Sequence, residues 1–190
     1  SGCECGADPA GDAEPRVAPS GGEAPPSAPS AARPAAESEG PALGAVVTIE
    51  WPFIAEAEVQ MQADAFVRVF GHEQARDLEL VLADRSLGAG CESSFGYGEE
   101  IPAHTYAFRA STGGQKFSGA AGSIEGLSFT AYHRRPGAAQ GTNSGFTGEQ
   151  EGKVVRIELS SLLEDRVVGT FLASTGASSI RAEFVAHRCP

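Results

Sequence analysis

Apolar and polar side chains alternate along most of the chain after position 44, and this alternation narrows the folds open to it. Between positions 55 and 69 every odd position is apolar, while Glu, Gln, Asp and Arg take most even positions. A period of two places the two sets of side chains on opposite faces of a β-strand. Because Ala, Glu, Gln and Met also favour helices, a helix is the alternative for the first half of this segment.

Other segments repeat the alternation and are separated by Gly-rich stretches. The sequence predicts about eight strands, near 45–51, 55–69, 78–83, 104–109, 127–132, 154–159, 167–173 and 180–187. Many short alternating strands are typical of sandwiches and barrels. We therefore expect an all-β fold, an antiparallel sandwich or barrel of about eight strands, in which positions 42–190 form a single β-sandwich-like domain.

The first 41 residues differ in composition from the rest. They hold eight of the 12 prolines, no aromatic residue, Leu, Ile or Met, and seven acidic residues against two arginines, a charge of −5. Such a segment buries too little apolar surface to offset the entropy lost on ordering. We predict that residues 1–41 form a disordered tether with a root-mean-square span of about 35 to 40 Å.

Ser1-Gly2-Cys3 resembles the end of a bacterial lipobox, in which the cysteine is acylated. The resemblance implies a signal peptide that has been removed, a lipid on Cys3, and a protein anchored to a membrane of the bacterial cell envelope, in the periplasm or at the outer surface. The alternatives are a secreted protein with an ordinary signal peptide, or a disulfide from Cys3 and Cys5 to another partner. Two thiolates alone do not complete a tetrahedral metal site, so no metal is expected there.

Cys91 and Cys189 are the two cysteines of the predicted domain. In an oxidising compartment they would most simply pair with each other. Closing a loop of about 100 residues stabilises a fold by up to about 4.7 kcal/mol in the chain-entropy model. The competing interpretation is a reactive cysteine, but His187 lies two residues from Cys189 on the same predicted strand and is not placed as an oriented base. We predict a Cys91–Cys189 disulfide.

The last part of the chain resembles the terminal strands of uncharacterised bacterial envelope lipoproteins with a β-rich domain. The residues that carry the likeness are Gly152–Ser160 (GKVVRIELS), Val168–Phe171 (VGTF) and Ile180–Phe184 (IRAEF), followed by a late cysteine. The resemblance implies a β-rich envelope domain. It assigns no catalytic residue.

The sequence contains none of the common catalytic signatures, such as G-x-S-x-G, G-x-x-x-x-G-K-[ST] or H-E-x-x-H. Its four histidines, at positions 72, 104, 133 and 187, have no spacing that favours a shared metal. The net charge of −11 without a Lys/Arg cluster argues against nucleic acid as a partner. No run of apolar residues is long enough to span a bilayer. We assign no catalytic residue, metal or cofactor.

Aromatic residues in predicted loops are the remaining candidates for binding. Phe95 and Tyr97 follow Cys91, and Phe146 lies in the predicted loop 136–152. Exposed aromatic rings on a rigid β scaffold often engage sugars or proteins, although these rings could instead cover the ends of the sandwich. We expect a non-enzymatic, lipid-anchored envelope protein whose β-domain binds a protein or glycan partner. The alternative is a secreted hydrolase or metal-dependent enzyme with a site built from distant loops.

Overall fold

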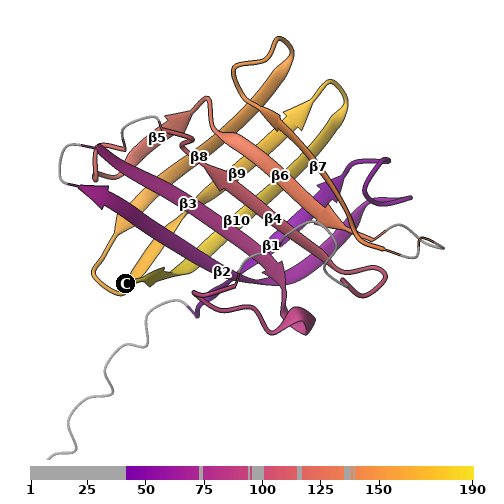
Figure 1. The fold of residues 1–190 in the computed structure, drawn as a ribbon, viewed down its shortest axis with the longest axis horizontal. Coiled ribbons are helices and arrows are strands. Elements are labelled where there is room, and N and C mark those ends of the chain that lie inside the picture. The colour runs from indigo at the N-terminus through magenta and orange to yellow at the C-terminus, as the bar shows by residue number, and fades with distance from the viewer. Residues whose placement is uncertain are drawn as a thin grey trace, which may run out of the picture. The chain divides into compact units, whose positions relative to one another are not determined.

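The computed structural model of the chain describes residues 42–72, 75–93, 95, 101–114, 117–134, 138 and 140–190. The predicted tether 1–41 with Cys3, and the candidate binding residue Tyr97, lie outside the described residues. The predicted all-β fold is confirmed (Figure 1). Its elements are β1 (Gly44–Glu50), β2 (Val59–His72), β3 (Ala75–Asp84), a 3-10 turn (Arg85–Leu87), β4 (Tyr106–Ser111), β5 (Gly122–Glu125), β6 (Ser128–His133), β7 (Thr142–Thr147), β8 (Lys153–Leu162), β9 (Arg166–Thr175) and β10 (Ser178–Cys189).

The ten strands form one curled sheet in the order β5-β8-β9-β10-β1-β2-β3-β4-β6-β7. Every neighbouring pair in this order is antiparallel. Where β1 begins at Gly44, β10 continues past it and pairs in parallel with β2 over His187–Cys189. The helix alternative for the first half of 55–69 is not adopted, since a turn precedes Val59 and the strand then runs on to His72.

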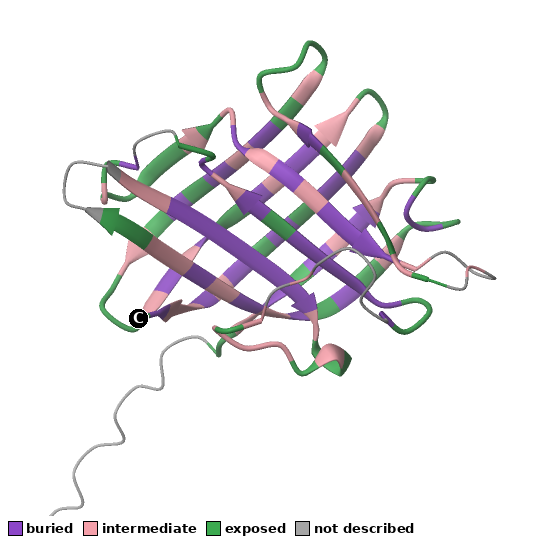
Figure 2. Cartoon of the chain, viewed as in Figure 1, coloured by how far each residue is buried: buried purple, intermediate pink, exposed green. Residues whose placement is uncertain are grey.

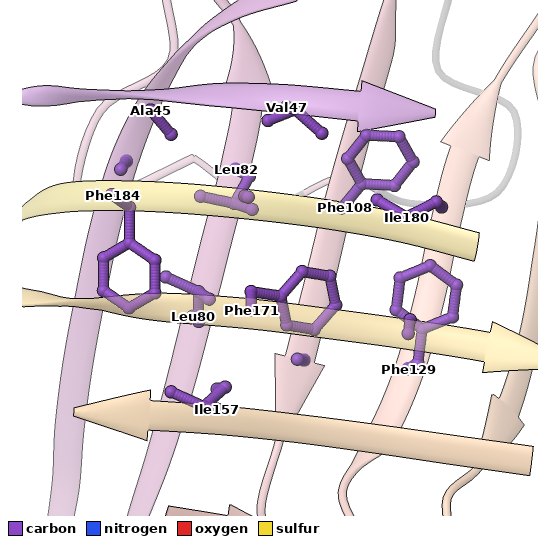
Figure 3. Packing of buried hydrophobic residues seen from close by; sticks show 14 of the residues in the cluster. Ala45, Val47, Leu80, Leu82, Phe108, Phe129, Ile157, Phe171, Ile180 and Phe184 are labelled. Atoms are coloured by element: carbon purple, nitrogen blue, oxygen red, sulfur yellow. The ribbon is translucent and has the colours of Figure 1, made fainter. Parts of the chain in front are cut away.

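The curl brings the two halves of the sheet face to face across the core. In Figure 1, β2, β3, β4 and β6 cross steeply over β8, β9 and β10. Large rings fill the space between the layers, with Phe129 at 6.2 Å from Phe108 and 5.9 Å from Phe171, measured between ring centroids (Figure 3). Side chains of strands that are distant in sequence therefore share one core, as in orthogonal packing of two sheets.

Alternation decides which side chains enter this core. Figure 2 shows buried and exposed residues alternating along the strands. In β10, for example, Ile180, Ala182 and Phe184 are buried, whereas Arg181 and Glu183 between them are exposed. Each strand thus has an inward and an outward set of side chains, and the outward sets are where a partner can bind. No helical segment in the described residues has the length and apolar character of a membrane span.

Candidate functional site

The described part of the β3–β4 connection covers one region of the outer surface. Leu87, Ala89 and Phe95 from this connection pack against a small buried cluster on the outward side of β3, β4 and β6. The cluster consists of Ala83, Ile101, Ala107 and Tyr132. Phe95 lies 5.9 Å from Tyr132 between ring centroids and is half-buried, so this candidate ring contributes to the cover.

A disulfide holds this connection to the end of the chain. Cys91 and Cys189 are bonded, as predicted, with their Cα atoms 5.6 Å apart. Arg68 of β2 adds three hydrogen bonds: its Nε donates to the carbonyl of Cys91 at 2.7 Å, its Nη2 to the carbonyl of Ser93 at 2.6 Å, and its Nη1 to Glu79 at 2.7 Å. The connection is therefore fixed by the disulfide and by two hydrogen bonds from Arg68, whose guanidinium group also contacts Glu79 of β3.

Phe146 lies in strand β7 and not in a loop, which corrects the predicted loop 136–152. Its ring is buried in the core, 5.3 Å from Phe129 and 5.6 Å from Trp51 between centroids. The strand was missed because its sequence, TNSGFT, contains one large apolar residue and no alternation. The Lys153 ammonium group lies 5.3 Å from the centre of the Phe146 ring.

The outward side of β1, β8, β9 and β10 is different, because no described segment covers it. We call this surface the open face. Backbone pairing places its outward residues in rows that cross the strands, with Arg156 beside Leu172 and Leu172 beside Arg181. The residues that define the open face are Val46, Thr48, Arg156, Glu158, Thr170, Leu172, Arg181 and Glu183.

Two adjoining hollows lie on the open face. One has a volume of about 550 Å³ and is lined in part by Arg156, Leu172 and Arg181. The other, of about 460 Å³, extends toward Gln62 and Arg85. Both hollows share Val46, Thr170 and Glu183, so they form one continuous depression across four strands.

A bulge in β8 borders this depression, since Ser160 and Gly169 line the smaller hollow. The β8–β9 register shifts between Leu159 and Ser161, which pair with Gly169 and Val168 respectively. A bulge bends the strand and increases its local twist. A Cβ atom on Gly169 would lie 2.3 Å from the carbonyl oxygen of Glu158 and 2.9 Å from the Phe184 ring, so only glycine allows this close approach.

Ion pairs lie among the aliphatic side chains of the open face. The Arg156 Nε atom lies 3.3 Å from a carboxylate oxygen of Glu158, and its Nη1 atom lies 3.8 Å from one of Glu125. The Arg181 Nη2 atom lies 3.4 Å from a carboxylate oxygen of Glu50. Val46 is 47% exposed, and its neighbours across the strands are Glu183 of β10 and Gln62 of β2. Across the open face, charged side chains on β8 and β10 therefore alternate with aliphatic or methyl-bearing side chains on β9 and β1.

The three histidine side chains that the structure describes do not gather at one site. His133 is buried in β6 with its Nε2 3.4 Å from the Thr142 hydroxyl, whereas His104 lies in an exposed turn at a φ of 64° and His187 faces outward on β10. The side chain of His72 lies outside the described set. Within the described residues, no group of three or more His, Cys, Asp or Glu side chains is arranged to hold a metal ion.

No family model, curated protein or solved structure matches this chain. The function has therefore to be inferred from the residues themselves. The open face was missed at the level of sequence, although a signal was present: β8 and β9 carry apolar residues at adjacent positions, in Val154–Val155, Val167–Val168 and Phe171–Leu172. Adjacent apolar residues in a strand point to opposite faces, so one of each pair must lie outside the core.

Proposed function

We propose that this chain is a non-enzymatic protein of the bacterial cell envelope, anchored by a lipid on Cys3, and that its β-domain binds a protein partner through the open face. The observation that carries the proposal is the contrast between the two outer surfaces. One is covered by a connection held by a disulfide and by Arg68. The other leaves Val46 and Leu172 accessible in a continuous depression.

A protein partner fits the open face better than a glycan. Half of the residues that define this face present aliphatic or methyl groups, and none of them is aromatic. Aliphatic surface with a polar rim is common at protein interfaces, and rings that could stack on a sugar are placed elsewhere, with Phe95 against Tyr132 and Phe146 in the core.

Disulfide chemistry supports export from the cytoplasm. Disulfides such as Cys91–Cys189 form and persist in oxidising compartments and are rare in reducing ones.

Lipidation can be tested separately from binding. Mass spectrometry of the protein recovered from its native cells should find a diacylglycerol group on Cys3, and an unmodified Cys3 in protein from the soluble fraction would contradict the anchor.

Binding at the open face can be tested with a photoreactive amino acid. Replacement of Leu172 by a photo-crosslinking residue should give an adduct with a discrete protein when intact producing cells are irradiated. The matched control is the same replacement at Glu151, an exposed residue of the β7–β8 turn that lies outside the open face. Absence of an adduct at position 172, or an adduct that a glycosidase removes, would overturn the proposal of a protein partner.

A further inference from the structure

The charges of the open face lie in two adjacent rows that cross the strands. Pairing of β8 with β9 and of β9 with β10 places Arg156, Leu172 and Arg181 side by side, and Thr48 of β1 continues this basic row. The same pairings define an acidic row two residues away along each strand. It consists of Glu158, Thr170, Glu183 and Val46.

We propose that the protein bound by the open face is a second copy of this chain, related to the first by a two-fold axis. The axis lies in the interface and runs between the two rows. The rotation about this axis places each strand of one copy opposite the same strand of the other copy. The basic row of each copy then lies opposite the acidic row of the other. Arg156 of one copy then faces Glu158 of the other, and Arg181 faces Glu183. Each contact occurs twice, as in any isologous interface.

The uncharged positions of the two rows also match under this rotation. Leu172 of one copy faces Thr170 of the other, and Thr48 faces Val46, so aliphatic and methyl groups meet on β9 and on β1. A two-fold axis along β9 would instead bring Arg156 against Arg181 and Glu158 against Glu183. An axis midway between β9 and β10 would place every charged residue opposite an uncharged one. Like charges in direct contact oppose association, so the charge pattern selects the axis that runs across the strands.

The charged groups of the open face are free to form these new contacts. The side chains of Arg156 and Arg181 are 39% and 63% exposed, so their ion pairs within the chain are largely in solvent. Glu183 is exposed and forms no ion pair with any residue that the structure describes. Docking would therefore give Glu183 a guanidinium partner and add a second carboxylate to each arginine.

The size of the face indicates a weak dimer. The four strands of the open face, from β8 to β1, span about 19 Å, and the two rows take up about four residues, or about 13 Å, along each strand. Such a face is roughly 250 Å² per copy, well below the roughly 800 Å² per partner of a standard interface. We expect a concentration-dependent dimer that weakens as salt is added, because its charged contacts are exposed to solvent.

Charge reversal tests the proposed axis. The full chain should dimerise in sedimentation equilibrium, and R181E should weaken the dimer at least about tenfold because a carboxylate at position 181 would face Glu183 at two places. E183R should weaken it similarly. An equimolar mixture of R181E and E183R should restore dimers, since each chain then presents the charge that the other lacks. R156E and E158R offer the same test on β8.

The control variant is Glu50→Gln, which removes the partner of Arg181 within the chain and leaves both rows intact, so its dimer should be unchanged.

The inference rests on the proposed function, and the experiments distinguish the failure of one from the failure of the other. A chain that stays monomeric, or variants that dimerise like the native chain, would overturn the inference. Adducts of a monomeric chain with another protein at Leu172 would leave the proposed function standing, whereas loss of all adducts would contradict both.

Discussion

Arg68 connects three parts of the molecule through one guanidinium group. It contacts Glu79 of β3 and the carbonyls of Cys91 and Ser93 in the β3–β4 connection. Glu79 is 3% exposed and also pairs with Arg109 at 2.5 Å. A buried carboxylate is stabilised only when it is paired, so this cluster depends on both arginines. Its bonds hold the cover over β3, β4 and β6 in place.

Tyr106 leads to a prediction about pH. Its side chain is 5% exposed, and burial, followed by the negative charges of Asp84 and Glu56, raises the pKa of its hydroxyl. The neutral hydroxyl favours the folded state fully below the unfolded pKa of about 10, and this contribution is lost as the pH rises through the higher folded pKa. Above pH 10, the native chain should therefore lose stability relative to Tyr106→Phe in urea unfolding. A constant difference between the two chains would contradict the raised pKa.

Strands β5 and β7 show where alternation fails as a predictor at the level of elements. Their sequences, GSIE and TNSGFT, are short or rich in small polar residues. The pairing of Phe129 with Phe146 and of Ile124 with Ile157 places them in the sheet. Partners distant in sequence supply both the hydrogen bonds and the apolar surface, which is why β propensity depends so strongly on context.

The β8–β9 pair gives a prediction about packing. In Gly169→Ala, the new Cβ atom would lie 2.3 Å from the backbone carbonyl oxygen of Glu158. A backbone atom within a sheet cannot move aside as the end of a flexible side chain can. We expect a loss of about 1–3 kcal/mol in the free energy of unfolding, measured by urea denaturation. Gly90→Ala is the matched control, because nothing lies within 4 Å of its Cβ position. Equal stability of the two variants would show that the bend at the bulge tolerates a side chain.

For the whole molecule, the disulfide joins the end of β10 to the β3–β4 connection across a separation of 98 residues. Cys91→Ser with Cys189→Ser should lower the free energy of unfolding by about 2–5 kcal/mol in urea denaturation. Limited proteolysis of the folded variant should also cut the β3–β4 connection faster than in the oxidised native chain. If both cysteines of the folded, unreduced native protein reacted with an alkylating agent, the disulfide itself would be refuted.

The alternation of apolar and polar residues and the number of cysteines were enough to predict the fold class, most strands and the disulfide from the sequence alone. Alternation is a property of neighbouring residues, so it predicted the all-β class and most strands, including β8, β9 and β10. The Cys91–Cys189 pair followed because the predicted domain contains no third cysteine. The assignments of Cys3, of the tether and of the envelope stay predictions, since they concern residues or surroundings outside the described structure.

Only the tertiary structure decided which outward surface is covered and which is open. Phe95 and Phe146 both look like loop aromatics in the sequence, yet Phe95 packs from the β3–β4 connection against Tyr132 and Phe146 enters the core. Likewise, Arg156 and Arg181 become neighbours of Leu172 only through strand register. Register and curl depend on contacts between residues far apart in the chain, and local patterns do not encode those contacts individually.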